Sequence, residues 1–324
     1  MQINEYLEPF DRMLEAAATP AAIRALEAGG SASSMWQEIA TSGFLDALIP
    51  HEHGGASLSL GEIEPLVEVL GARAVPLPVS ETMVARALLR RLGEAVPDGP
   101  IVLVPEIAQP VPCGLLAEHV LLRSGDDMIL CNVSDLAVIP TGVSYSLSAR
   151  FSAPTKGTKL SIPPEDIRAV AAVLRASLIA GAAGRLCEIT TTYASARVQF
   201  GKPIGSQQAV QHMLAVMAED MIACRIAAQL AAAQGIDVTL AAAAVAKITA
   251  SAAAPRIAAS AHAVHGAIGI SEEYDLHLLT RRLHEWRLAD GSEGYWSRVL
   301  GDFRLQRQDN SVNWMRENIW WQSL

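Results

Sequence analysis

The stretch Tyr193-Ala-Ser-Ala-Arg-Val-Gln-Phe-Gly-Lys-Pro-Ile-Gly-Ser-Gln-Gln-Ala-Val-Gln211 decides how the rest of this chain is interpreted. It places Arg197 and a Gly-Lys-Pro turn between two long helical patterns. An arginine offers a planar fork of N–H donors, and the start of the following helix offers free backbone N–H groups, so the segment could hold a pyrophosphate. The alternative is a plain connection between two helices, with Arg197 in a salt bridge.

Two further stretches extend the pattern. The first is Val264-His-Gly-Ala-Ile-Gly-Ile-Ser-Glu-Glu-Tyr-Asp-Leu-His-Leu278, which is followed by Arg281-Arg282. The second is weaker and consists of Trp36, Gly43, Ile49-Pro50, Gly54-Gly55, Leu60, Glu62 and Glu68 to Gly71. Together with the stretch above, they resemble the acyl-CoA dehydrogenase family over most of the chain, with a gap in the middle.

The resemblance implies a cofactor and the residues that contact it. In the family, the first stretch is a signature for flavin adenine dinucleotide (FAD). The glycine run of the second stretch approaches the ADP half of a flavin that is bound by a neighbouring subunit. The positions of this chain that match and are expected to contact FAD are Arg197, Gln199, Phe200, Gln208, Gly266 and Gly269. Two departures weaken these contacts, because alanines stand at 263 and 267 where the family has glutamine and glycine.

Composition excludes several classes of protein. The 324 residues carry a net charge of −9, which argues against a protein that binds a phosphate backbone, so no nucleic-acid partner is expected. The four cysteines are scattered without metal-ligand spacing, and the loop His51-Glu52-His53 matches a family turn, so no metal is expected. The N-terminus lacks a secretory signal, and the alanine-rich stretches contain charges, such as Arg175 and Lys247, that argue against a membrane span. We therefore expect a cytoplasmic protein.

Along the chain the residue pattern changes from helical to β-type and back to helical, which predicts a mainly α protein with a small β domain. Residues 1–96 have the pattern of an N-terminal helical domain. Residues 97–162 contain short β-type runs separated by Gly, Asp and Pro, namely Ile101–Val104, His119–Leu122, Met128–Leu130 and Leu136–Ile139. Residues 163–324 are helical again, and the resemblance implies a four-helix bundle that carries the flavin-contacting motifs. Within them we expect one apolar stripe between Gln208 and Ala228 and an alanine-rich helix from about Asp237 to Ala263, kinked at Pro255.

The middle domain departs from the family in the part that matters for the flavin ring. In the family this domain holds the ring through a stretch of the type T-E-P-x-A-G-S-D and a later strand that contains Trp. Neither is present between Ala95 and Ile162, and the region is about half the expected size. The chain therefore lacks the evident donors for the ring of its own flavin, although Arg197 can still reach a flavin of another chain.

The catalytic base is a second departure. In the family a carboxylate removes the α-proton of an acyl-CoA thioester while a hydride leaves the β-carbon. Its commonest position, a Glu in a Y-E-G-T turn, aligns here with Ala289-Asp290-Gly291-Ser292, and its minority position falls on Ala171 and Ala172. Asp290 is thus the candidate base, one methylene shorter than the usual side chain. The alternative is that Asp-Gly-Ser is an ordinary turn and helix N-cap.

These observations lead to one main expectation and two alternatives. The chain resembles the truncated small subunit of heteromeric bacterial acyl-CoA dehydrogenases of the steroid side-chain type, and would give ADP-side contacts to FAD shared with a full-length partner, in a heterotetramer. It would then act on an acyl-CoA and pass electrons to an electron-transfer flavoprotein or a similar acceptor. The alternatives are a self-associating, self-sufficient enzyme that uses Asp290, and a scaffold subunit without flavin.

Overall fold

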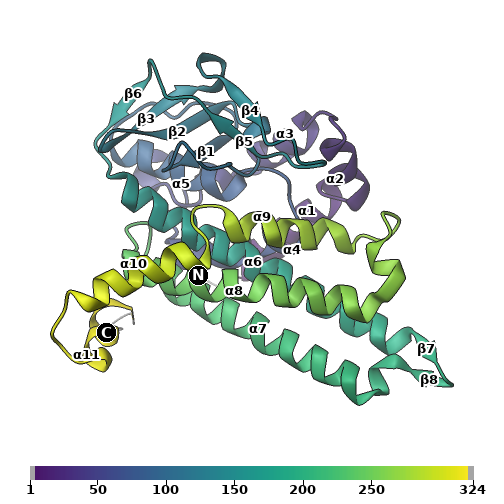
Figure 1. Cartoon of the computed structure of the whole chain (residues 1–324). Coiled ribbons are helices and arrows are strands. Elements are labelled where there is room, and N and C mark those ends of the chain that lie inside the picture. The colour runs from purple at the N-terminus through teal and green to yellow at the C-terminus, as the bar shows by residue number, and fades with distance from the viewer. Residues whose placement is uncertain (1–3, 320–324) are drawn as a thin grey trace.

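The computed structural model describes residues 4–319 and is mostly helical, which confirms the expected fold class. Figure 1 shows a small sheet layer lying over a bundle of long helices, with shorter helices at the flanks. The helices are α1 Asn4–Ala17, α2 Pro20–Glu27, α3 Ser33–Thr41, α4 Leu60–Ala72, α5 Val79–Arg91, α6 Pro164–Ala196, α7 Gln208–Ala232, α8 Leu240–His265, α9 Leu276–Leu288, α10 Glu293–Leu305 and α11 Ser311–Asn318.

The main sheet has four short strands in the order β1-β2-β3-β6, with β1 and β2 parallel and the other pairs antiparallel. The last expected run, Leu136–Ile139, is a strand only at its end, because the Leu136 N–H donates to the Val133 carbonyl at 3.0 Å and closes the preceding 3₁₀ turn, Val133–Asp135. Its strand β4 pairs with β5 in a separate two-stranded sheet. The strands of these two sheets are β1 Ile101–Val104, β2 His119–Ser124, β3 Asp127–Asn132, β4 Val138–Pro140, β5 Ala149–Phe151 and β6 Thr158–Leu160.

Helix α6 forms the centre of the molecule. It begins with Pro164 in its first turn, followed by Glu165 and Asp166, which suit the positive end of the helix dipole. Buried residues occur all around most of its length, as expected for a helix that is apolar on every side and is covered by others. It packs against α4, α7, α8 and α9, so that these helices share one core.

The crossing of α4 and α6 depends on two glycines. A Cβ atom added at Gly71 would lie 2.1 Å from the carbonyl oxygen of Leu178. A Cβ atom added at Gly181 would lie 1.8 Å from the carbonyl oxygen of Glu68. Both distances are far below van der Waals contact, so the two backbones can approach this closely because neither position carries a side chain.

The two long helices that follow α6 agree with the predicted patterns, with local differences. On α7, the predicted stripe includes Val210, Met217 and Cys224, which are buried. Helix α8 begins three residues later than predicted, because the Thr239 hydroxyl accepts a hydrogen bond from the backbone N–H of Ala242 at 3.2 Å and caps the helix. The helix continues through Pro255 to His265.

Two helices, α6 and α8, are long and apolar enough to cross a membrane by length and composition alone. In the most apolar window of each, 89% and 61% of the residues are buried inside the protein. Core helices of folded domains have the same composition, so this is weak support for a membrane span.

Candidate functional site

The first motif forms the end of α6, a short hairpin and the start of α7. After Arg197, the hairpin pairs β7, Val198–Gln199, with β8, Lys202–Pro203, and it projects from the bundle (Figure 1). Its two turn residues, Phe200 and Gly201, have left-handed backbones with φ of 52° and 80°, the geometry of a type I′ hairpin turn. The turn leaves the Phe200 side chain 93% exposed.

The second motif forms the end of α8 and the turn that follows. Gly266 has φ 62° and ψ −137°, a backbone conformation that residues with a Cβ atom rarely adopt. Gly269 is buried in the next 3₁₀ turn, where an added Cβ atom would lie 2.8 Å from the Cβ of His265. The backbone at Gly266 is exposed and carries no side chain, so a ligand could approach it closely.

The fold brings these two motifs to the same end of the bundle. Val264 packs in one cluster with Ala194, Ile204 and Val210. The Tyr193 ring stacks on the His265 ring at a centroid distance of 4.4 Å, and its hydroxyl donates a hydrogen bond to the His265 carbonyl at 3.4 Å. Segments about 70 residues apart in the sequence therefore form one surface, which we call the bundle-end site, Arg197 to Gln208 with Gly266 to Ile270.

The bundle-end site offers groups that fit the ADP half of a dinucleotide. Arg197 is exposed, and within residues 4–319 it makes no ion pair, so its guanidinium is available for a pyrophosphate. The alternative of a salt-bridged linker arginine has no support in this part of the chain. Gln199 and Gln208 are also exposed, as are the apolar side chains of Phe200 and Ile270. The residues predicted for FAD contact are thus brought together, although Gly269 is buried.

Asp290 lies away from the bundle-end site, and its carboxylate is already bound by an arginine. Its carboxylate is 9% exposed and accepts a hydrogen bond at 2.9 Å from Arg175 on α6. Arg175 is 2% exposed and also pairs with Glu81 on α5 at 2.7 Å. Burial alone would lower the pKa of Arg175, but the Glu81 and Asp290 carboxylates outweigh burial and raise it. The arrangement, which we call the buried triad, consists of Glu81, Arg175 and Asp290.

A buried lysine lies beside the buried triad. Lys247 of α8 donates hydrogen bonds to the Ser251 hydroxyl at 2.9 Å and to the carbonyls of Trp286 and Arg287 at 2.8 Å. These carbonyls belong to the last turn of α9, whose C-terminus is thereby capped by an amine from inside the core. Burial lowers the pKa of Lys247 to about 7, although the Asp290 carboxylate opposes the shift.

The turn that contains Asp290 also begins α10. Asp290 and Gly291 have positive φ values of 56° and 101°, and the Trp296 indole N–H donates to the Asp290 carbonyl at 3.0 Å. Ser292 is the N-cap of α10, so this segment does form a turn and a helix N-cap, while a catalytic role of Asp290 stays a prediction. Helix α9 separates this turn from the bundle-end site by roughly 20 Å, given 1.5 Å per residue.

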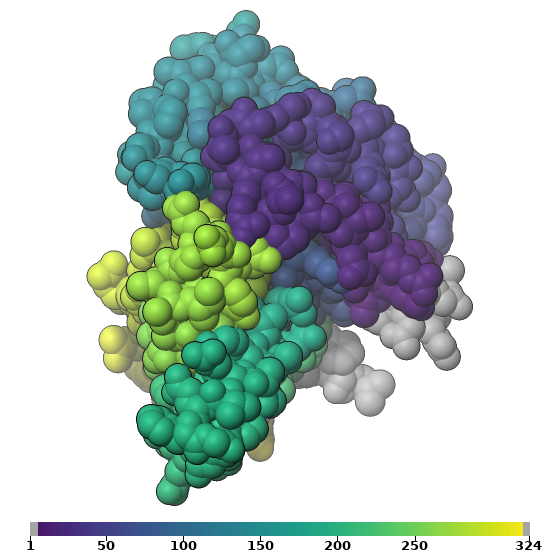
Figure 2. Space-filling model, turned by 90° about the vertical axis from the view of Figure 1, so that its right-hand side faces the viewer, coloured from purple at the N-terminus to yellow at the C-terminus, as the bar shows by residue number. Residues whose placement is uncertain are grey.

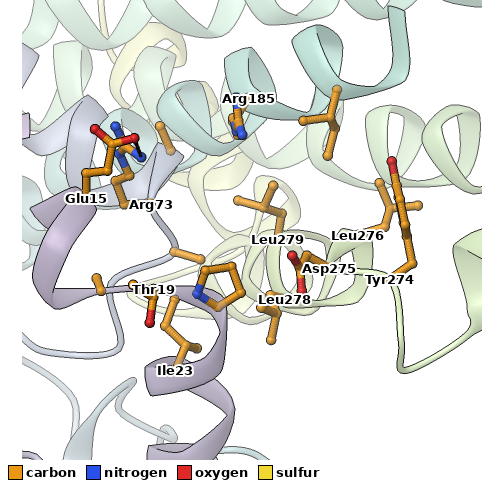
Figure 3. Close-up of a pocket in the computed structure, with 15 residues that line it drawn as sticks. Glu15, Thr19, Ile23, Arg73, Arg185, Tyr274, Asp275, Leu276, Leu278 and Leu279 are labelled. Atoms are coloured by element: carbon orange, nitrogen blue, oxygen red, sulfur yellow. Dashed lines mark ion pairs between the residues drawn. The ribbon is translucent and has the colours of Figure 1, made fainter. Parts of the chain in front are cut away.

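Two cavities lie near these sites. One of about 410 Å³ opens where α1, α2, α4, α6 and α9 meet (Figure 3). Apolar side chains such as Ile23 and Leu279 line it, and its cations are neutralised, since Arg73 pairs with Asp11 and Glu15 while Arg185 pairs with Glu188. This cavity therefore has no evident preference for an anion.

The second cavity, of about 460 Å³, lies between α9 and the β4–β5 segment. The segment is tied to α9 by the Ser148 hydroxyl, which donates to Glu285 at 2.5 Å. Arg282 pairs with Glu27 at 3.0 Å and with Glu285 at 2.8 Å. Among residues 4–319, no group of three or more His, Cys, Asp or Glu side chains could hold a metal ion.

Comparison with known proteins identifies the family. The model of the acyl-CoA dehydrogenase C-terminal domain matches residues 169–302. The acyl-CoA dehydrogenase IpdE2 of Mycobacterium tuberculosis is 34% identical over 286 residues, which cover 82% of this chain and 86% of IpdE2. The chain belongs to the acyl-CoA dehydrogenase family.

Two further matches differ in their coverage. The acyl-CoA dehydrogenase FadE34 of M. tuberculosis is 31% identical over 323 residues, which cover 87% of this chain but 44% of FadE34. A chain in the crystal structure of the ChsE4-ChsE5 complex from M. tuberculosis superposes with a TM-score of 0.83 at 20% identity, covering 95% of this chain and 98% of that one. The superposition shows the same fold.

Sequence reasoning missed the partners of Asp290. It treated Arg175 only as a charge that argues against a membrane span, and it did not single out Glu81 or Lys247 as site residues. The available signal was a charged residue inside an apolar run, such as Ala-Ala-Val-Leu-Arg175-Ala-Ser-Leu-Ile. A charge in such a run is buried with a partner when the helix is covered on all sides.

Proposed function

We propose that this chain is a subunit of a flavin-dependent acyl-CoA dehydrogenase and gives ADP-side contacts to an FAD held mainly by a full-length partner chain. The observation that carries the proposal is the bundle-end site, where Arg197, exposed and without an ion pair among residues 4–319, lies at the same end of the bundle as the exposed backbone of Gly266. Arg197 would neutralise the pyrophosphate through charge-assisted hydrogen bonds. Gly266 would let the backbone approach the cofactor, and Phe200 would cover part of its surface.

The bound FAD would supply the hydride acceptor for the α,β-desaturation of an acyl-CoA thioester. The buried triad supports assigning the catalytic base to the partner rather than to Asp290. A base must reach the α-proton of the substrate, whereas the Asp290 carboxylate is buried and bound by Arg175. In the proposed assembly this chain binds and orients one part of the cofactor, and the partner removes the proton.

Coverage of the relatives supports a partner chain. The match to FadE34 leaves more than half of that protein outside the region shared with this chain. The ChsE4-ChsE5 structure is a complex of two proteins. We infer a hetero-oligomer, with a bulky acyl-CoA such as a steroid side-chain thioester as substrate, an electron-transfer flavoprotein or similar acceptor, and a cytoplasmic location.

The test is flavin content. The chain is purified alone and together with a full-length homologue encoded beside it, and the ratio of flavin absorbance to protein is measured. We expect little or no FAD on the chain alone and about one FAD per pair of chains in the complex. Stoichiometric FAD on the chain alone would instead favour the self-sufficient enzyme that uses Asp290. A complex that forms without any flavin would favour the scaffold.

A further inference from the structure

Three aromatic rings from three segments of the chain meet next to the bundle-end site. Tyr193 belongs to the last turns of α6, His265 is the last residue of α8, and Tyr274 lies in the turn before α9. Between centroids, the His265 ring lies 4.4 Å from the Tyr193 ring, at an interplanar angle of 25°, and 5.1 Å from the Tyr274 ring. His265 is 3% exposed, so its imidazole is shielded from water. We call these three residues the aromatic cluster.

The aromatic cluster fixes one peptide unit of the site, the unit that joins His265 to Gly266. The carbonyl of this unit accepts a hydrogen bond from the Tyr193 hydroxyl at 3.4 Å, and its N–H donates to the carbonyl of His262. Since a peptide unit is planar, holding both of its polar groups sets the direction in which the Gly266 backbone leaves α8. Tyr193 is also tied to Arg197, whose backbone N–H donates to the Tyr193 carbonyl at 2.8 Å. One tyrosine therefore relates the two halves of the bundle-end site to each other.

The His265 imidazole is held as one neutral tautomer. Its Nδ1 lies 2.8 Å from the Ala261 carbonyl, which can only accept, so Nδ1 carries the hydrogen. Nε2 is then a bare acceptor; it is buried, and among residues 4–319 it has no hydrogen-bond partner. A second proton would turn Nε2 into a buried donor without an acceptor and would place a charge in the core, and both changes cost free energy.

The surroundings of the imidazole do not offset such a charge. The titratable and charged groups near it are His262 on its own helix, Tyr193 on α6 and, before α9, Tyr274, which in turn lies near Asp275 and Arg185. Within the described part of the chain, no carboxylate acts on the imidazole itself. Burial lowers the pKa of His265 from its ordinary value of 6.5; the hydrogen bond to Ala261 opposes the shift, and His262 adds to it.

We propose that neutral His265, stacked on Tyr193, positions the Gly266 backbone for the flavin, and that the contact with FAD weakens when the imidazole is protonated. The role is one of positioning, since the buried imidazole acts on the site through the peptide unit that leads to Gly266. It rests on the flavin contact proposed above. Because the pKa of His265 in the folded chain lies below its ordinary value, the contribution of the neutral form is present above about pH 6.5 and is lost as the pH falls below this value.

The pH profile of FAD affinity tests this role. FAD is titrated into the complex with the full-length homologue at about pH 7.5 and about pH 5, and the dissociation constant is measured by the change in flavin fluorescence. For wild type we expect affinity to fall roughly three- to tenfold at the lower pH, the effect of about one lost hydrogen bond. His265→Phe keeps a ring for stacking and cannot be protonated, so it should bind FAD within about threefold of wild type at pH 7.5 and should not show this fall. His119→Phe, at a half-buried histidine of β2 in the sheet, is the matched control and should follow the wild-type profile.

Tyr193→Phe tests the link between the two halves of the site without changing the imidazole. It removes only the hydroxyl that holds the His265 carbonyl, so the complex should assemble and bind FAD roughly two- to tenfold more weakly at both pH values. This mild variant also decides the question if His265→Phe does not assemble. A His265→Phe complex with the wild-type pH profile, or a Tyr193→Phe complex with wild-type affinity, would overturn the positioning role and leave the flavin contact in place. A wild-type complex that binds no FAD at either pH would overturn the proposed function and this role together.

Discussion

Arg175 determines the state of the candidate base. It holds one carboxylate from α5 and one from the turn after α9, and all three side chains of the buried triad are 9% exposed or less. Removing one member of a buried ion pair leaves an uncompensated charge, which typically costs about 3–5 kcal/mol. Asp290 can therefore contribute to stability without touching a substrate, and the two roles can be separated by experiment.

Asp290→Asn should leave turnover of the assembled complex nearly unchanged and lower its stability. Asparagine keeps an oxygen that can accept from Arg175 but loses the charge, at a cost of about 1–3 kcal/mol. Turnover is measured per folded, flavin-loaded complex, and stability by thermal unfolding. A loss of activity of about 10²- to 10⁴-fold in a folded, yellow complex would identify Asp290 as the general base after all.

Arg197→Ala should lower the flavin content of the complex without unfolding it. The lost charge-assisted hydrogen bond is worth roughly 1.5–3 kcal/mol, which corresponds to at least about a tenfold weaker affinity for FAD. Arg90→Ala is the matched control, because Arg90 is also exposed and makes no ion pair among residues 4–319. Equal FAD occupancy in the two variants would assign Arg197 a purely structural role.

The environment of a single residue was predictable where it depends on the residues next to it in the sequence. The exposure of Arg197 and the cap at Ser292 follow from short stretches whose turn residues are visible in the sequence. The partner of Asp290 was not predictable in this way, because Arg175 lies 115 residues away and pairs with it only through the packing of α6 beside the turn after α9. Ion pairs between distant elements depend on tertiary structure.

At the scale of elements, the stability of the fold is highly sensitive to any side-chain atom added at the α4–α6 crossing. Gly181→Ala should destabilise the chain by about 1–3 kcal/mol or more, because the new methyl group meets the backbone carbonyl of Glu68, which cannot move independently. Gly184→Ala on the same helix is the control, since its Cβ would meet only the flexible end of Arg225 at 3.2 Å. Alanine favours a helix over glycine, so we expect this control to be neutral or stabilising by up to about 1 kcal/mol. Urea unfolding of both variants measures the difference, and equal effects would contradict the prediction.

Element types were predictable, and several boundaries were not. The period of apolar residues predicts α7 and α8, and alternation with turn residues predicts β1, β2 and β3. The fourth run, Leu136–Ile139, has the same composition, yet its first two residues are not in a strand. Which part of such a run pairs depends on where its neighbour β5 lies, and the sequence pattern does not contain this information.

At the scale of the whole molecule, stability should depend on pH through Glu64. This carboxyl group of α4 is buried in the core, where the nearby Ser177 and Gln229 side chains and Arg225 only partly oppose the effect of burial. Burial, aided by the nearby Glu68, raises the pKa of Glu64 from its ordinary value of 4.5 to about 8. The folded state therefore holds a proton that the unfolded state releases between these values, and the stability that the proton gives is lost as pH rises from about 4.5 to 8.

Glu64→Gln should remove this pH dependence. Glutamine has nearly the same shape and cannot ionise, so the substitution should stabilise the protein at pH 8 relative to wild type, by an amount on the order of a few kcal/mol, and much less at pH 5. Urea unfolding of both proteins at the two pH values gives the comparison, and any contribution from Lys247 is common to both. A constant difference between the proteins would show that Glu64 does not titrate in this range.

The buried triad also limits which evolutionary paths are open to this chain. Replacing Arg175 would release Asp290 but leave Glu81 as a second unpaired carboxylate in the core, and replacing Glu81 would leave Arg175 holding Asp290 alone. No single substitution frees a working carboxylate without lowering the stability of the fold. Freeing Asp290 as a base would need at least two coordinated changes with an unstable intermediate, so the triad keeps this carboxylate in a structural role.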